Sequence, residues 1–208
     1  MRALTLAEYD GKGWRNPRDL QLQKLPANQR WIGGERSGRR QLLQSVDARV
    51  DSPMLFAAGE PVEVSVDSEV EWLPNGELIS FRSWQRRYTV LSSVPAVGAE
   101  TLRSVGDWGV DAAGSGNRLP LGEQLYLQLP ASVPPRVHDL AAQLTLTATT
   151  LYDKATLLES YLRQFPYDLS VPEPPITIDD VADYFLFDLQ RGYCDYYATA
   201  FIVMARSL

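Results

Sequence analysis

The spacing of apolar residues changes once along the chain, from a period of two to a period near 3.6, just after Pro130. A period of two is typical of strands with one buried face, and a period near 3.6 is typical of amphipathic helices. The sequence therefore predicts an α+β protein, with a β-rich domain over residues 1–130 and a helical domain over 131–208. A length of 208 residues is enough for both to have a core.

The clearest predicted strand covers residues 61–73. Its apolar residues share one face and its carboxylates the other, the apolar set being Val62, Val64, Val66, Val70 and Trp72. Asn75 and Gly76 follow and predict a tight hairpin turn with two residues of positive φ. Residues 78–91 are the expected partner strand, and residues 125–129 a last strand. Together with the turn signal at residues 10–13, these patterns predict a small antiparallel sandwich or open barrel.

Four helices are predicted after Pro130. The first begins with Ser132 as its N-cap, the second covers about 151–164, and the third begins with Thr177 as its cap. The last begins at about Asp195. Its buried stripe is expected on the face that also carries Cys194, formed by Ala198, Phe201, Ile202, Ala205 and Leu208.

Cys194 is the only cysteine, and it follows Gly192 at the start of this last helix. The N-terminus of a helix carries partial positive charge and free N–H groups. This environment favours the thiolate, the nucleophilic form of cysteine. The alternative is a structural cysteine, because free cysteines are among the most buried residues.

The string from Arg191 to Arg206, with Gly192, Cys194 and Ala198 at the spacing Gly-x-Cys-x-x-x-Ala, resembles the nucleophile motif of the transglutaminase-like superfamily. The resemblance is to its membrane-anchored bacterial branch, the TgpA type. It implies a papain-like core of which this chain holds the helical half, and acyl transfer from a glutamine amide, or amide or peptide hydrolysis, through a thioester on Cys194. It does not separate transferase from protease.

In this family a histidine and then an aspartate follow the nucleophile helix and complete the catalytic triad. The 208 residues end at that helix, so we expect an amino-terminal fragment that is inactive alone. The only histidine, His138, precedes the cysteine and would break the family's order as a base. The backbone N–H of Cys194 is a candidate oxyanion donor. Tyr167 and Tyr193 are candidates to line the substrate cleft, but for each of them a packing role alone is the favoured interpretation.

The net charge of −6 argues against nucleic acid or an anionic membrane surface as a partner. One histidine and one cysteine make a metal site implausible, and the sequence has no phosphate loop or dinucleotide motif, so we expect no metal and no cofactor. No apolar run is long enough to span a bilayer.

By resemblance, the chain lies on the extracytoplasmic side of a bacterial membrane, is anchored only through segments absent from it, and acts on a protein or peptide. The competing hypothesis is a non-catalytic extracytoplasmic binding module, in which the β domain binds a partner and the helices form a docking platform.

Overall fold

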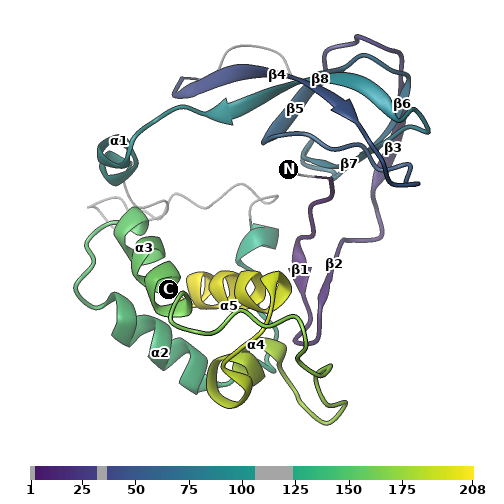
Figure 1. The fold of residues 1–208 in the computed structure, drawn as a ribbon. Helices are drawn as coiled ribbons and strands as arrows, with labels where there is room; N and C mark the ends of the chain where they lie inside the picture. The colour runs from purple at the N-terminus through teal and green to yellow at the C-terminus, as the bar shows by residue number, and fades with distance from the viewer. Residues whose placement is uncertain (1–2, 32–36, 106–123) are drawn as a thin grey trace. The chain divides into compact units, whose positions relative to one another are not determined.

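The computed structural model describes residues 3–31, 37–105 and 124–208 (Figure 1). The chain divides into two compact units. The β unit comprises residues 1–6 and 17–98, and the helical unit comprises residues 7–16 and 99–208. This division differs from a boundary at residue 130, because the hairpin at residues 7–16 and the short helix α1 (Ala99–Ser104) cluster with the later helices. Sequence order hides this arrangement, since the hairpin's partners follow it by more than a hundred residues.

The β unit contains two antiparallel three-stranded sheets. One has the order β3-β6-β7 and the other β4-β8-β5. The strands are β3 Gln21–Leu25, β4 Arg39–Asp47, β5 Glu60–Val64, β6 Ser68–Trp72, β7 Leu78–Arg82 and β8 Arg87–Pro95. Buried side chains from both sheets form one core, among them Leu25, Val64, Val70, Phe81 and Val90. The α+β class and the antiparallel β domain are therefore confirmed.

Both long strands predicted from the sequence are in fact broken in two. The stretch 61–73 is interrupted at residues 65–67, so that β5 lies in one sheet and β6 in the other. The stretch 78–91 is interrupted at residues 83–86 and changes sheet in the same way between β7 and β8. The apolar face was predicted correctly, since Val62, Val64 and Val70 are buried. Alternation reports only which face is buried, and it continues unchanged where a strand bends from one sheet to the next.

The hairpin between β6 and β7 is confirmed, but its turn has a different geometry from the one predicted. Only Gly76 has a positive φ, of 83°. Asn75 instead stabilises the turn through its side chain, whose Oδ1 accepts a hydrogen bond from the backbone N–H of Glu77 at 3.1 Å. Asparagine side chains commonly bond the backbone two residues on in this way.

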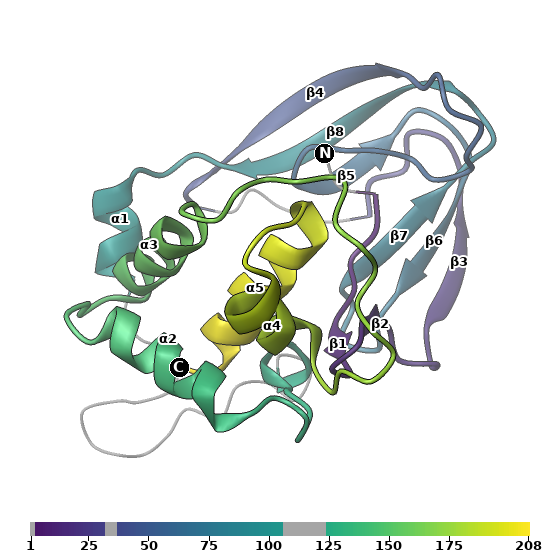
Figure 2. The same ribbon diagram turned by 60° about the horizontal axis from the view of Figure 1, so that its bottom comes forward.

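The helical unit is built around its last helix. Its elements are β1 Glu8–Tyr9, β2 Trp14–Arg15, α1, a 3₁₀ turn Gln124–Leu127, α2 Pro135–Thr145, α3 Leu151–Leu162, α4 Val181–Tyr184, a π-helical turn Phe185–Leu189 and α5 Cys194–Arg206. Helix α5 contacts α2, α3, α4 and the π-helical turn, and Figure 2 shows it between these elements. The core includes Tyr9, Val137, Leu158, Phe185 and Val203.

Three details of this unit correct the sequence predictions. The strand expected at 125–129 is the 3₁₀ turn, because a run of alternating leucines too short to pair does not force an extended backbone. The N-cap of α2 is Pro134 and not Ser132. The third helix begins after Asp180 and not Thr177, and the Asp180 carboxylate accepts a hydrogen bond from the N–H of Asp183 at 2.9 Å.

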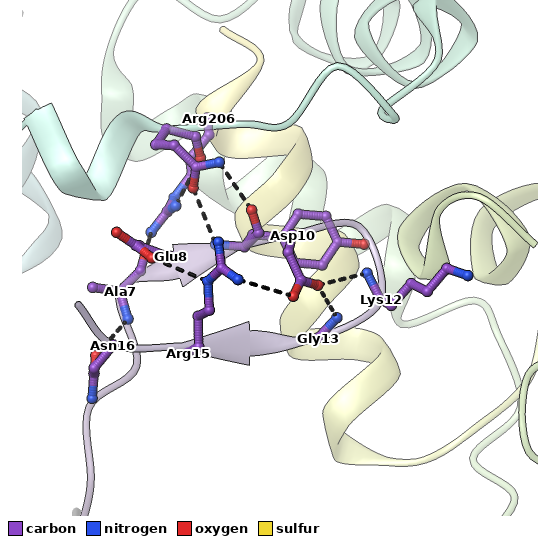
Figure 3. Close-up of polar contacts among 10 residues, drawn as sticks. Ala7, Glu8, Asp10, Lys12, Gly13, Arg15, Asn16 and Arg206 are labelled. Atoms are coloured by element: carbon purple, nitrogen blue, oxygen red, sulfur yellow. Dashed lines mark hydrogen bonds and ion pairs between the residues drawn. The ribbon is translucent and has the colours of Figure 1, made fainter. Parts of the chain in front are cut away.

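The amino-terminal hairpin is tied into the helical unit at several points (Figure 3). Its turn, predicted at residues 10–13, is closed by Asp10, whose Oδ1 accepts hydrogen bonds from the N–H groups of Lys12 and Gly13. Arg206, the last residue of α5, donates to the carbonyl oxygen of Ala7 at 2.9 Å. The indole N–H of Trp14 donates to Thr199 Oγ1 at 2.9 Å. The hairpin therefore fixes α5 along its carboxyl-terminal half.

Candidate active site

Cys194 is the first residue of α5, and its side chain is exposed. Tyr193 is the N-cap residue and has an extended backbone, which starts the helix without a side-chain cap. The first N–H groups of a helix have no intrahelical acceptor, so that of Cys194 is available to an oxygen outside the helix. The thiol donates a hydrogen bond to Oδ1 of Asp195, with an Sγ–Oδ1 distance of 3.3 Å.

The buried face of α5 differs from the predicted one. The buried residues are Tyr196, Thr199, Ala200, Val203 and Met204. On the predicted face, Ala198, Ala205 and Leu208 are exposed, and Phe201 and Ile202 are half-buried. Nearly every position of this helix is apolar, so periodicity alone could not choose the face. Cys194 therefore lies on the open side of the helix and not in the interior expected of a structural cysteine.

Gly192 is held in place by a short parallel pairing with residues 166–168. Its N–H donates to the carbonyl oxygen of Pro166 at 3.2 Å, and its carbonyl oxygen accepts from the N–H of Asp168 at 2.7 Å. A Cβ atom at Gly192 would lie 2.9 Å from Cδ2 of Tyr196. Glycine is thus required here because the ring of a helix residue approaches the backbone closely, and not because of a positive φ.

Tyr167, in the paired segment, is the more exposed of the two predicted cleft residues, with 63% of its surface accessible. Its ring stacks on that of Tyr197, with centroids 6.1 Å apart, and the Tyr197 hydroxyl donates to the carbonyl oxygen of Phe165 at 2.7 Å. Tyr193 is half-buried and packs edge-on against Tyr196 at 5.1 Å. Both tyrosines lie on segments that adjoin Cys194, because Tyr167 pairs with Gly192 and Tyr193 directly precedes the cysteine. Tyr193 also has a packing role.

The aromatic support under this region was not predicted as part of the site. Phe185 is fully buried and contacts the rings of Phe165, Tyr196 and Tyr197 at centroid distances of 5.4, 5.6 and 5.1 Å. Gln190 then turns the chain toward the cysteine with a φ of 50°, and its N–H donates to the carbonyl oxygen of Phe185 at 2.9 Å. The sequence carried no signal for this turn, because a left-handed residue is usually glycine or asparagine.

His138 lies on α2 and is half-buried, and the thiol is hydrogen-bonded to Asp195 and not to this imidazole. Within residues 3–31, 37–105 and 124–208, no group of histidine, cysteine and carboxylate side chains is arranged to hold a metal ion. Among the same residues, no helix is long and apolar enough to cross a membrane.

Residues 138–208, which contain α3, α4, the cysteine and the whole of α5, match the sequence model of the transglutaminase-like superfamily. This part of the chain is transglutaminase-like. The match begins within α2 and includes the helix that begins with Cys194.

The whole chain also resembles longer bacterial proteins. It is 28% identical, over 224 aligned residues, to the uncharacterized protein YebA of Bacillus subtilis, covering 99% of this chain and 29% of that protein. Two crystal structures of the periplasmic domain of TgpA from Pseudomonas aeruginosa share its fold. One has a TM-score of 0.57 at 22% identity. The other, bound to ethylmercury, has a TM-score of 0.55 at 23% identity.

The chain thus spans less than a third of its curated relative and slightly under two thirds of the solved periplasmic domains, at 65% and 64% of their lengths. At these identities the structural likeness establishes the fold. Both units of the chain contribute to it, since 99% of the chain is covered.

Proposed function

We propose that Cys194 is the nucleophile of an acyl-transfer reaction on an amide of a protein or peptide. The observation that carries this proposal is the exposed thiol on the first residue of a thirteen-residue helix. An exposed sulfur at this end of a helix can approach a carbonyl carbon, and the neighbouring N–H groups can stabilise the oxyanion that forms.

The chemistry proceeds in two halves. The thiolate sulfur attacks the amide carbonyl carbon, and the oxyanion of the tetrahedral intermediate is stabilised by the N–H of Cys194. The C–N bond then breaks, the amine leaves with a proton, and the acyl group remains on sulfur as a thioester. An amine or a water molecule attacks the thioester and releases the thiol. An amine acceptor makes the reaction a transfer, and water makes it a hydrolysis.

Each half needs a base that takes and returns a proton. The 208 residues hold one histidine, His138, and the thiol has Asp195 as its hydrogen-bond partner instead. The Cys–His–Asp order of the family puts the base after the nucleophile helix. We therefore also propose that this polypeptide alone does not turn over an amide substrate, and that a histidine and an aspartate from further sequence complete the active protein.

The proposed location is the extracytoplasmic side of a bacterial membrane. Support comes from the solved neighbours, both of which are described as periplasmic domains. Anchoring is assigned to segments outside these 208 residues.

The nucleophile assignment is tested by thiol modification of the folded chain. Iodoacetamide and an ethylmercury salt should each add one group per native chain. Neither reagent should modify the Cys194→Ser variant. The organomercurial is a suitable probe because one of the solved TgpA structures is bound to ethylmercury. Resistance of the native chain to both reagents would contradict the assignment.

The acyl-transfer step is tested with a glutamine-containing donor peptide, by following ammonia release. The 208-residue chain should release none above background. A protein translated from a gene that continues past codon 208 into a histidine and an aspartate should be active, and its Cys194→Ser variant inactive. Cys194-dependent turnover by the short chain would instead identify His138 as the base. An inactive longer protein would favour the non-catalytic binding module.

A further inference from the structure

The β unit holds a groove of about 620 Å³ that no part of the acyl-transfer chemistry uses. It lies at one end of the three-stranded sheet, where the end of β3, the start of β6 and the end of β7 meet. Pro53, from the segment between β4 and β5, contributes a further wall. This volume is in the range of pockets that bind small ligands.

Trp84 stands at this groove with 79% of its surface accessible to water. It follows β7 directly, in the turn that leads to β8. An indole ring is a large apolar surface, and leaving it in water is unfavourable. A flat, exposed aromatic face beside polar groups suits a ligand ring with an apolar face and polar edges.

The charges that line the groove cancel. Lys24 and Arg82 oppose Asp67 and Glu69. Lys24 Nζ lies 3.6 Å from a carboxylate oxygen of Glu69, and Arg82 is paired with Glu71 at 2.9 Å. A lining with no net charge and with its cations already paired favours a neutral ligand over a phosphate or a nucleotide.

Two polar atoms of lining residues are buried without a hydrogen-bond partner. They are Oγ of Ser68, a residue only 5% exposed, and Nε of Arg82. Buried polar atoms in proteins are almost always satisfied, by the protein, by water or by a ligand. The Arg82 nitrogen can only donate, whereas the serine hydroxyl can donate or accept. Both atoms have almost no accessible surface, so the polar groups that a ligand in the groove meets are instead the exposed carboxylates of Asp67 and Glu69.

The groove walls offer little to the main chain of an extended peptide. Pro26 and Pro53 have no N–H to donate. The N–H of Ala27 is already bonded to Asp67, and that of Ser83 to the carbonyl oxygen of Pro53, both at 2.8 Å. Peptides that dock along sheet edges depend on such main-chain hydrogen bonds.

We propose that this groove binds a neutral carbohydrate chain, with the C–H face of one sugar ring on the Trp84 indole and its hydroxyls bonded to the exposed carboxylates of Asp67 and Glu69. The proposal does not depend on Cys194, so it can fail or succeed independently of the acyl-transfer reaction.

The test is isothermal titration of the 208-residue chain with three neutral hexasaccharides, namely cellohexaose, maltohexaose and N-acetylchitohexaose. At least one should bind, with a dissociation constant of about 10⁻⁴ to 10⁻³ M. Trp84→Ala should weaken that binding at least about tenfold. Leu43→Ala, which removes an apolar side chain of β4 that is 68% exposed and outside the groove, should leave it unchanged.

Thermal melting of both variants checks that the fold is kept, which we expect because Trp84 and Leu43 are largely exposed. Failure of all three sugars to bind at about 10 mM would overturn the proposal. So would equal binding by the Trp84→Ala variant. Trp84-dependent binding of a proline-rich peptide, with no binding of sugars, would reassign the groove to peptide recognition.

Discussion

The backbone of Gly192 lies so close to the ring of Tyr196 that a Cβ atom on the glycine would be 2.9 Å from Cδ2. Gly192→Ala should therefore lower the free energy of unfolding by about 1–3 kcal/mol, because the ring is buried and cannot move aside freely. It should also change the rate at which Cys194 is alkylated, since the residue lies two positions before the thiol. Urea unfolding and iodoacetamide kinetics measure the two effects.

Gly98→Ala is the matched control for this substitution. A Cβ atom there meets nothing within 4 Å, and Gly98 does not have a positive φ. Its stability should stay within about 0.5 kcal/mol of the native chain. An equal loss from both substitutions would show that the ring contact is not the cause.

The carboxylate of Asp195 accepts a hydrogen bond from the Cys194 thiol and opposes negative charge on the sulfur. Asp195→Asn should therefore speed alkylation of Cys194 by about three- to fivefold near neutral pH, the effect expected for adjacent charges in water. Asp19→Asn, which changes an exposed carboxylate of the β unit, should leave the rate unaltered. A slower reaction of the Asp195→Asn variant would mean that the carboxylate assists the thiol instead.

Asp180 is a buried carboxylate, only 3% exposed, and its Oδ2 has no hydrogen-bond partner. Burial raises its pKa above the ordinary value, and the nearby charge of Asp183 adds to the rise, whereas hydrogen bonds from the Asp183 N–H and from Tyr9 act against it. A raised pKa means that the folded state holds the proton more tightly than the unfolded state does. The stabilisation that Asp180 contributes is fully present below its pKa in the unfolded state. It is lost as the pH rises through its pKa in the folded state.

Asp180→Asn should therefore raise the free energy of unfolding by about 1 kcal/mol near pH 7, because it removes a buried charge while keeping a residue that caps helices well. The gain should shrink on acidification to below about pH 4, where the native carboxyl is protonated in both states. Asp179→Asn, at the exposed neighbouring position, should show neither effect. Denaturant unfolding of the three proteins at several pH values measures the effect. A gain in stability of Asp180→Asn that did not depend on pH would show that the buried charge is not its cause.

Arg206 joins α5 to two distant segments, donating to the carbonyl oxygens of Ala7 and Gln128 at 2.9 Å each, and lying over the Trp14 ring at 5.0 Å. Arg206→Ala should cost about 2–4 kcal/mol of stability, because both carbonyls lose a charged donor. Arg163→Ala, which breaks only an exposed pair with Glu159, should cost about 0.5 kcal/mol or less. If thermal unfolding showed the same loss of stability for both variants, the contacts of Arg206 with Ala7, Gln128 and Trp14 would not be what stabilises the fold.

The sequence was most informative where local chemistry decides structure. The turn at residues 10–13, the hairpin before Leu78 and the start of α3 all follow from side chains that act within a few residues. Cys194 was located at a helix start because the apolar residues that follow it recur at helical spacing.

The remaining features depend on partners far away in the chain. The bends between β5 and β6 and between β7 and β8 arise because two sheets must share one core, which alternation cannot show. The buried face of α5 was set by Phe185 and by the amino-terminal hairpin rather than by the helix itself. At the candidate site, the requirement for Gly192 came from packing against Tyr196, whereas the sequence suggested only a turn.

The β unit is inserted between the hairpin at residues 7–16 and the helices with which that hairpin packs. During synthesis the hairpin leaves the ribosome almost first, yet its partner Arg206 is added 199 residues after Ala7. The β unit, whose chain is complete by residue 98, can fold before the helices that pack on the hairpin have been synthesised. The surface around Cys194 therefore takes its final form only after Arg206 has been added, so that a chain released before that point has a folded β unit but an incomplete helical unit.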